Sequence, residues 1–270
     1  MEKTIEKPMN QAMLKYIVIV LMLLDHIAGG FLTSADVLYL PFRFISRLTA
    51  PTMAYFIAQG YQYTKNVKKY LLRLGIFAII SSFAFTLYEN GVLCPVQIVS
   101  GNTVPDDSRA WLYISSLNKT VVCFSTSVIF TLFLGLLSIL IWDKGNAHTA
   151  VKIILTVVIC YIADFGDWKY WDVLFCLNFY FLRNNKNKMW AVYSIIAVMY
   201  VFNFCLANNF APGINVGFYL YRTGVFLVIP FIELLYNGKA GKKSAFNKWF
   251  FYIFYPGHLL ALYAVKQLVG

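Results

Sequence analysis

The chain contains a series of apolar stretches, the longest of which match the thickness of a lipid bilayer. In residues 13–32 only Lys15 and Asp25 carry a formal charge, and about twenty apolar residues suffice for a membrane-spanning helix. Hydrophobic residues make up 60% of the chain and charged residues 13%, whereas soluble domains average roughly 45–50% and 25%. A soluble monomer could not bury this much apolar surface. The sequence therefore predicts a polytopic membrane protein and excludes a soluble enzyme, a secreted disulfide scaffold and a disordered chain.

The spacing of the apolar stretches predicts an all-α membrane helix bundle that forms a single domain over residues 1–270. About nine transmembrane helices are expected, over residues 13–32, 44–63, 70–88, 121–142, 149–165, 168–183, 189–206, 216–235 and 249–269. The fifth and sixth are short, and a re-entrant pair is the alternative for them. Either choice leaves the orientation of the other helices unchanged.

The net charge of +11, from 23 Lys and Arg against 12 Asp and Glu, comes mainly from the segments on one side of this bundle. With the N-terminus in the cytoplasm, most basic residues fall in cytoplasmic segments, as the positive-inside rule requires. In a soluble protein such a charge would indicate nucleic acid. In this chain it predicts contact with anionic membrane lipids, and we expect no nucleic-acid partner.

Charged residues also occur at membrane depth, where each costs about 2.5–3.5 kcal/mol and usually marks a functional path or an internal pair. Asp25 and His26 lie in the outer half of the first expected helix. Arg43 and Arg47 are four residues apart and share a helix face at a similar depth. They form either an ion-pair lock or a clamp for an anion. Because adjacent residues on a helix do not face each other, we expect Asp25 to pair with an arginine and another helix to orient His26.

The last expected helix contains a proline beside a histidine. Pro256 removes a helix hydrogen bond and clashes with the carbonyl of Tyr252, so a kink and an unsatisfied carbonyl are expected next to Gly257. His258 follows this point, and Tyr255 lies three residues before it on the same face. Residues 255–258 therefore either form a kink that shapes packing or belong to a functional site.

Other polar residues point less directly to a site. Arg222 lies near the outer end of the eighth expected helix, beside Tyr221. Three acidic residues flank the turn between the fifth and sixth helices, where ordinary loop charges are the simpler interpretation: Asp164, Asp167 and Asp172. Five cysteines without a CxxC pair and two intramembrane histidines without ligand spacing do not predict a metal site.

Several stretches of the chain resemble a known family. They are LKYI at residues 14–17, MLLDHI at 22–27, RFISRLTAP at 43–51, AQGY at 58–61, TKNVKKYLLRL at 64–74, FTLFLGL at 130–136, LYNGK at 235–239 and FYIFYPGHL at 251–259. In this order they resemble the TraX family of integral membrane proteins, which acetylates conjugative pilin and is similar to the wider set of transmembrane acyltransferases. The resemblance implies an acetyl- or acyltransferase of the bacterial cytoplasmic (inner) membrane, with acetyl-CoA as co-substrate and no metal.

The resemblance places the family's aspartate–histidine pair on Asp25 and His26, its paired arginines on Arg43 and Arg47, and its closing histidine on His258. The chemistry of acyl transfer then suggests expected roles for these and other residues. Asp25, His26 and His258 are the expected catalytic residues, with His26 as general base or covalent acyl carrier. The expected groups for the oxyanion or the acceptor's anion are Arg43, Arg47, Arg222 and Tyr255. The phosphates of CoA would bind at the cytoplasmic side to Lys65, Lys68, Lys69 and Arg73, or to Lys239 with Lys242 and Lys243.

Two other classes of function compete with the enzyme. A proton-coupled transporter or permease also predicts buried Asp, His and Arg beside a broken helix. A membrane assembly factor without chemistry is the third class. The acceptor of an enzyme remains open between a peptide amine, a glycan hydroxyl and a lipid headgroup.

Overall fold

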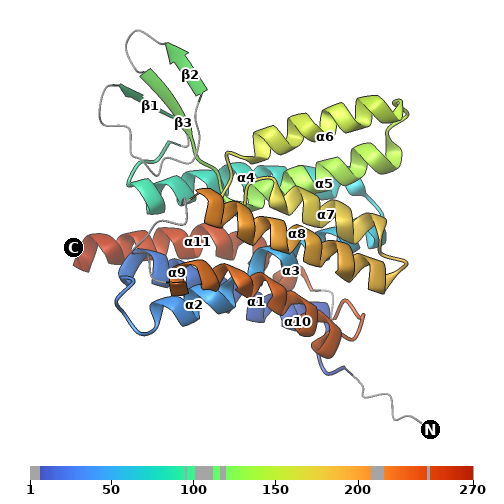
Figure 1. Ribbon diagram of the computed structural model, residues 1–270, viewed down its shortest axis with the longest axis horizontal. Coiled ribbons are helices and arrows are strands. Elements are labelled where there is room, and N and C mark those ends of the chain that lie inside the picture. The colour runs from blue at the N-terminus through green and yellow to red at the C-terminus, as the bar shows by residue number, and fades with distance from the viewer. Residues whose placement is uncertain are drawn as a thin grey trace. The chain divides into compact units, whose positions relative to one another are not determined.

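The computed structural model describes residues 7–94, 96–100, 112–115, 120–207, 216–241 and 244–269. Within these ranges the chain forms eleven α-helices, one 3-10 helix and one small sheet (Figure 1). Three helices are long and apolar enough to cross a membrane, by length and composition: α1 (Gln11–Phe31), α4 (Val67–Asn90) and α8 (Lys186–Ala207). The predicted helical bundle is therefore confirmed in its helical character, while insertion and orientation stay predictions.

Most of the expected helices have one counterpart in the structure. Besides α1, α4 and α8, these are α5 (Val128–Lys144), α6 (Thr149–Ala163), α7 (Trp171–Phe181) and α11 (Ala245–Val269). α11 continues through Pro256, so the expected kink stays a prediction. The short fifth and sixth helices, α6 and α7, are both present, but each is shorter than the three candidate spans.

Two expected helices are broken in the structure, and a proline follows each break. The helix expected at 44–63 is divided into α2 (Tyr39–Ser46) and α3 (Thr49–Tyr63). Pro51 cannot donate to the carbonyl of Arg47 and its ring crowds that carbonyl, which favours a break in the helix there. The helix expected at 216–235 is divided into α9 (Val216–Leu220), the 3-10 helix η1 (Tyr221–Leu227) and α10 (Val228–Leu235).

The fourth expected helix begins later than predicted, because residues at its start belong to a sheet. The strands are β1 (Val96–Ser100), β2 (Leu112–Ser115) and β3 (Thr120–Phe124). β3 pairs antiparallel with both neighbours. The apolar residues 121–124 therefore extend a strand, and α5 begins only after Ser127. Short apolar segments have this ambiguity between helix and strand.

The turn between α1 and α2 is closed by its own side chains. The backbone N–H and the hydroxyl of Thr33 both donate to the Asp36 carboxylate, at 2.7 and 2.9 Å. These two hydrogen bonds stabilise the charged form and hold the pKa of Asp36 below its usual value. The turn brings α2 back against α1.

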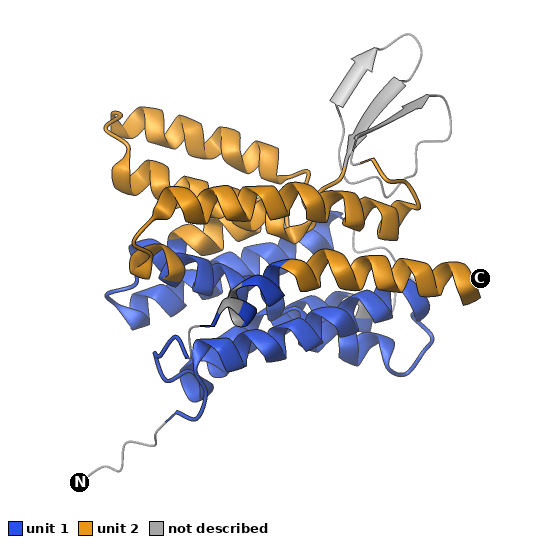
Figure 2. Ribbon diagram, turned by 180° about the vertical axis from the view of Figure 1, so that it is seen from behind, with its two compact units in different colours: residues 1–59, 178–252 blue, residues 60–177, 253–270 orange. Residues whose placement is uncertain are grey.

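The chain divides into two compact units, and each contains segments distant in sequence (Figure 2). Unit 1 comprises residues 1–59 and 178–252, and unit 2 comprises residues 60–177 and 253–270. In unit 1, α1 packs against α2, and α2 packs against η1. In unit 2, α4 packs against α5, and α5 against α6. The single domain expected from the sequence stays a prediction.

Candidate functional site

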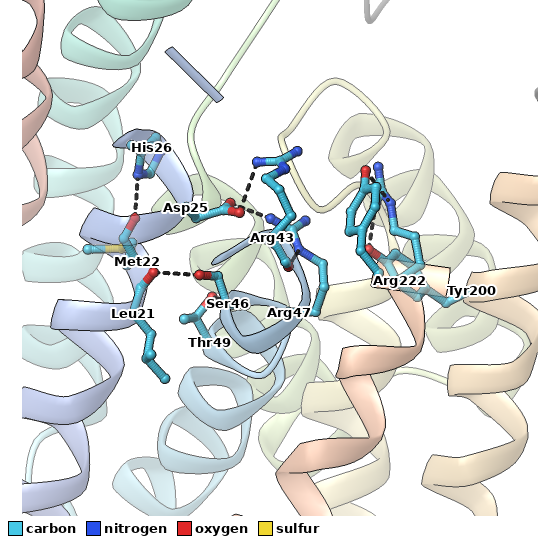
Figure 3. Close-up of polar contacts among 11 residues, drawn as sticks. Leu21, Met22, Asp25, His26, Arg43, Ser46, Arg47, Thr49, Tyr200 and Arg222 are labelled. Atoms are coloured by element: carbon cyan, nitrogen blue, oxygen red, sulfur yellow. Dashed lines mark hydrogen bonds and ion pairs between the residues drawn. The ribbon is translucent and has the colours of Figure 1, made fainter. Parts of the chain in front are cut away.

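The centre of the candidate site is a carboxylate held by two arginines. Arg43 Nη1 lies 2.9 Å from Asp25 Oδ1, and Arg47 Nη2 pairs with Asp25 Oδ2 (Figure 3). The Asp25 side chain is 16% exposed and that of Arg47 only 6%, so these charges are largely removed from solvent. Such a pair is stable only when hydrogen bonds satisfy both partners. The predicted pairing of Asp25 with an arginine is confirmed.

Hydrogen bonds between α1 and α2 position the two arginines. The buried hydroxyl of Ser46 donates to the carbonyl of Leu21 at 2.7 Å, one turn before Asp25. The hydroxyl of Thr49 donates in turn to the carbonyl of Ser46 at 2.8 Å. Because Arg43 and Arg47 lie on the same side of α2, this contact holds both guanidinium groups over Asp25.

His26 lies beside Asp25 but points elsewhere. Its Nδ1 lies 2.9 Å from the carbonyl oxygen of Met22, one turn back in the same helix (Figure 3). A carbonyl only accepts, so Nδ1 carries the hydrogen, and in the neutral ring Nε2 carries the lone pair. The expectation that another helix would supply the orienting partner is wrong for Nδ1, because α1 supplies it. The His26 ring, 8% exposed, is thereby held in one tautomer.

A third arginine belongs to the same unit and is held by aromatic residues. Arg222 in η1 donates from Nη1 to the hydroxyl of Tyr200 at 2.5 Å and from Nε to the hydroxyl of Tyr221 at 3.1 Å. Its guanidinium carbon lies 4.0 Å from the ring centre of Phe204, within the range of a cation–π contact. Arg222 therefore has neutral partners where Arg43 and Arg47 have a carboxylate.

The buried ring of Tyr221 links the three arginines. The guanidinium carbons of Arg43, Arg47 and Arg222 lie 5.4, 5.7 and 5.2 Å from the ring centre. The shared position of Tyr221 depends on a close approach of η1 to α2. At Gly224 this approach leaves no room for a Cβ, which would overlap the carbonyl oxygen of Phe44. The sequence singled out the three arginines, but it gave no signal that Tyr221 would lie among them.

The three arginines have one carboxylate among the residues that the structure describes. In unit 1 the described acidic residues are Asp25, Asp36 and Glu233. Asp36 closes its own turn, and Glu233 pairs with lysines. The group around Tyr221 therefore has an excess of positive charge, which favours binding of an anion.

His258 and Tyr255 belong to unit 2 and form a small group of their own. The ring centres of the two residues are 5.4 Å apart in an edge-to-face arrangement, as their spacing predicts. His258 Nδ1 lies 2.9 Å from the carbonyl oxygen of Phe254, and the ring of Phe254 is stacked on that of His258. Like His26, this histidine donates its Nδ1–H to the carbonyl oxygen one turn back.

Of the two alternative sets of basic residues expected to bind CoA, the first lies in unit 2, and Lys239 of the second lies in unit 1. Lys65, Lys68 and Lys69 are exposed around the start of α4 in unit 2, and Arg73 follows one turn later beside the ring of Tyr70. Lys239 is exposed in unit 1, and Lys242 and Lys243 lie outside the described residues. Their roles stay predictions.

Two residues that the sequence did not single out for a site are distinctive in the structure. Asp172, interpreted from sequence as a loop charge, is fully buried in the first turn of α7, with Oδ2 2.6 Å from the hydroxyl of Thr131. The apolar residues that follow Asp172 were a signal that it begins a helix. Lys15 lies in α1 against two phenylalanine rings. Within the described ranges, no three His, Cys, Asp or Glu residues come together as metal ligands.

Comparison with known proteins yields one family. The family model described as "TraX protein" matches residues 10–104 and 109–266. A curated relative, the probable fimbrial assembly protein FimC, serogroup H1, of Dichelobacter nodosus, is 28% identical over 256 residues, which cover 95% of each chain. No solved structure matches the chain.

Proposed function

The chain belongs to the TraX family, and from this membership we propose that it is an integral membrane acyltransferase. It would move an acetyl or other acyl group from cytoplasmic acyl-CoA to an amine or hydroxyl of a peptide, glycan or lipid at the membrane. The name of the Dichelobacter nodosus relative concerns fimbrial assembly, and a pilin-like peptide is the acceptor most consistent with it. The cytoplasmic membrane, with the N-terminus in the cytoplasm, is the proposed location.

The arrangement of His26 beside the Asp25 clamp is the observation that carries the proposal. With Nδ1–H donated to the carbonyl of Met22, Nε2 is the nitrogen that can accept a proton. An imidazole that accepts a proton at one nitrogen suits a general base. Asp25 is already paired with Arg43 and Arg47, so its role is to position α2 and its arginines.

In the proposed reaction the acyl group moves from the CoA sulfur to the acceptor, and His26 transfers one proton in the opposite direction. His26 Nε2 takes the proton from the acceptor's N–H or O–H as the acceptor attacks the thioester carbonyl. The oxygen of that carbonyl gains negative charge, which a guanidinium group stabilises. When the C–S bond breaks, the imidazolium of His26 returns the proton to the CoA thiolate. The products are the acylated acceptor and CoA, and no oxidant or reductant is required.

The arginines divide into two roles in this proposal. Arg43 and Arg47 are engaged by Asp25, whereas Arg222 has only hydroxyl and ring partners among the described residues. Arg222 is therefore the arginine best suited to an anionic group of the acceptor or to the oxyanion. The resemblance of its segment to the family assigns His258 a supporting role, either in stabilising the oxyanion or in relaying the proton.

Replacement of His26 tests the proposal. Membranes that contain the protein are incubated with radiolabelled acetyl-CoA, and label is measured in envelope peptide, glycan and lipid fractions. His26→Ala should lower the transfer rate by about 10²–10⁴-fold, the usual contribution of a general base, while the detergent-purified protein stays monodisperse. His148→Asn is the control, because the exposed His148 caps α6 through the N–H of Ala150 and Asn can also cap. Near-normal transfer by His26→Ala would contradict the assignment.

A proton-coupled transporter is the second candidate, and buried Asp172 favours it. A carboxyl group at membrane depth with a single described hydroxyl partner, Thr131, is typical of proton pathways. Two observations separate the candidates. A transporter would show no transfer of label from acetyl-CoA and no stabilisation by CoA thioesters.

A further inference from the structure

Lys15 is a cation in the second turn of α1 that the proposed mechanism does not use. Its Nζ lies 5.6 Å from the ring centre of Phe56 in α3 and 5.6 Å from that of Phe251 in α11. All three residues belong to unit 1. A lysine ammonium has three N–H donors, and aromatic faces attract its charge without accepting those hydrogens as an oxygen would.

The described carboxylates of unit 1 are all engaged with other groups. Asp25 binds Arg43 and Arg47, and Asp36 closes the turn after α1. Glu233 lies 3.2 Å from Lys7 and 3.3 Å from Lys186. None of these carboxylates is within ion-pair distance of Lys15, so its partners in the described part of the chain are the two rings.

The N-terminal end of α1, close to Lys15, has a positive potential of its own. The first turn of α1 contains no acidic residue, although the positive end of a helix dipole favours one. An anion bound at this end would be attracted by the dipole and by Lys15 in the next turn. The chain also brings Lys239 to this end, because its carbonyl oxygen accepts from the N–H of Gln11 at 2.9 Å.

Lys15 and His26 lie on one face of α1. They are eleven residues apart, which is close to three full turns and roughly 16 Å along the axis. In an acyl-CoA the phosphates and the thioester lie at opposite ends of the pantetheine arm. A single ligand along this face would therefore place an anion at one residue and a thioester at the other.

We propose that Lys15 binds a phosphate group, and that this phosphate belongs to the CoA thioester whose acyl carbon reacts at His26. The inference rests on the proposed function, and it adds the residue that anchors the donor substrate. Phe56 and Phe251 hold the ammonium in place through their faces. A phospholipid headgroup would offer the same phosphate chemistry and is the competing source.

The experiment measures binding alone, without transfer. Purified protein in nanodiscs of zwitterionic lipid is titrated with CoA and, separately, with acetyl-pantetheine, which lacks the phosphates of CoA. Lys15→Gln should weaken CoA binding roughly ten- to hundredfold, the effect of losing one hydrogen-bonded charge, and leave acetyl-pantetheine binding unchanged. Lys15→Met, which retains an apolar stem against the rings, should behave in the same way, and Lys15→Arg should retain most of the affinity. The exposed Lys144, replaced by Gln, is the matched control.

Each outcome separates the inference from the proposed function. Failure of the unaltered protein to bind CoA would contradict the proposed function itself. Equal CoA affinity of the unaltered and Lys15→Gln proteins would overturn the inference and leave the proposed function standing. Thermal stabilisation that depends on Lys15 and appears only when anionic phospholipid replaces zwitterionic lipid would assign the phosphate to a headgroup and also overturn it. Equal loss for CoA and acetyl-pantetheine would show a general structural defect and count against a phosphate contact.

Discussion

At the scale of single residues, the cost of charge in a membrane made the centre of the site predictable. A carboxylate among apolar residues needs a partner, and Arg43 and Arg47 were the basic residues at matching depth; both contact Asp25. The hydrogen-bond acceptor of His26 Nδ1 was not predictable. A carbonyl of the same helix, here that of Met22, is available to any helical histidine in a suitable rotamer. Lys15 was not singled out, since sequence cannot show that the described carboxylates of its unit are all engaged with other groups.

Asp25→Asn tests whether the clamp supports the fold. The substitution removes the negative charge between two largely buried guanidinium groups, and the free energy of unfolding should fall by roughly 3 kcal/mol, the lower end for a broken buried pair. Arg47→Met should also destabilise, because it leaves Asp25 with Arg43 alone. The double variant should lose less than the sum of the single variants, because the two residues act on one pair.

Unfolding of the detergent-purified variants, followed by circular dichroism, measures these effects. The unaltered protein and each single variant provide the reference for the cycle. Strictly additive losses would show that Asp25 and Arg47 do not stabilise each other.

At the scale of elements, the sequence located the apolar segments well but not their interruptions. The ends of α1, α4 and α8 lie within three residues of the expected ranges. α2 and α3 were expected as one helix, because hydropathy does not register the missing N–H of Pro51. In the same way, Pro230 cannot donate to the carbonyl of Phe226 in η1. A short 3-10 segment such as η1 inside a helix often marks a functional hinge. The division at η1 places Arg222 and Tyr221 against α2, a tertiary contact that no local pattern contains.

Gly224→Ala tests the packing of η1 on α2. A Cβ at this position would overlap the carbonyl oxygen of Phe44, so the two elements must separate, at a cost of about 1–3 kcal/mol for overpacking. Separation would also move Tyr221 away from the arginines, and acyl transfer should fall with stability. Thermal unfolding and the transfer assay measure the two effects.

Gly257→Ala in α11 is the matched control for this variant. Nothing lies within 4 Å of a Cβ at Gly257, and Ala in a helix interior is favoured over Gly by roughly 0.5–1 kcal/mol. This variant should be neutral or more stable. The packing argument would be contradicted by a Gly224→Ala protein as stable as the control.

At the scale of the whole molecule, composition predicted the class of protein and the family was recognised from short segments, whereas the division into units was not foreseen. Helices α3, α7 and α11 each contribute to both units, so no linker or change in composition marks a boundary. The sheet formed by β1, β2 and β3 also escaped prediction, because its strands are short: β1 and β2 lie between two expected helices, and β3 covers the start of the helix expected at 121–142. Residues that packing brings together across long sequence distances, such as Arg47 and Tyr221, carry no signal in a single sequence.

The predicted orientation of the chain can be tested with a cysteine that is already present. Cys94 is exposed just after α4, in the loop expected outside the cytoplasm because the basic residues concentrate in the other segments. A membrane-impermeant maleimide should therefore label Cys94 in spheroplasts but not in sealed inside-out vesicles. Cys94→Ser should abolish this labelling. Lys68→Cys in the Cys94→Ser background should show the reverse pattern, because Lys68 is exposed at the opposite end of α4. Labelling of Cys94 only in inside-out vesicles would invert the topology, and the end of α1 that carries Lys15 would then face away from the cytoplasmic supply of CoA.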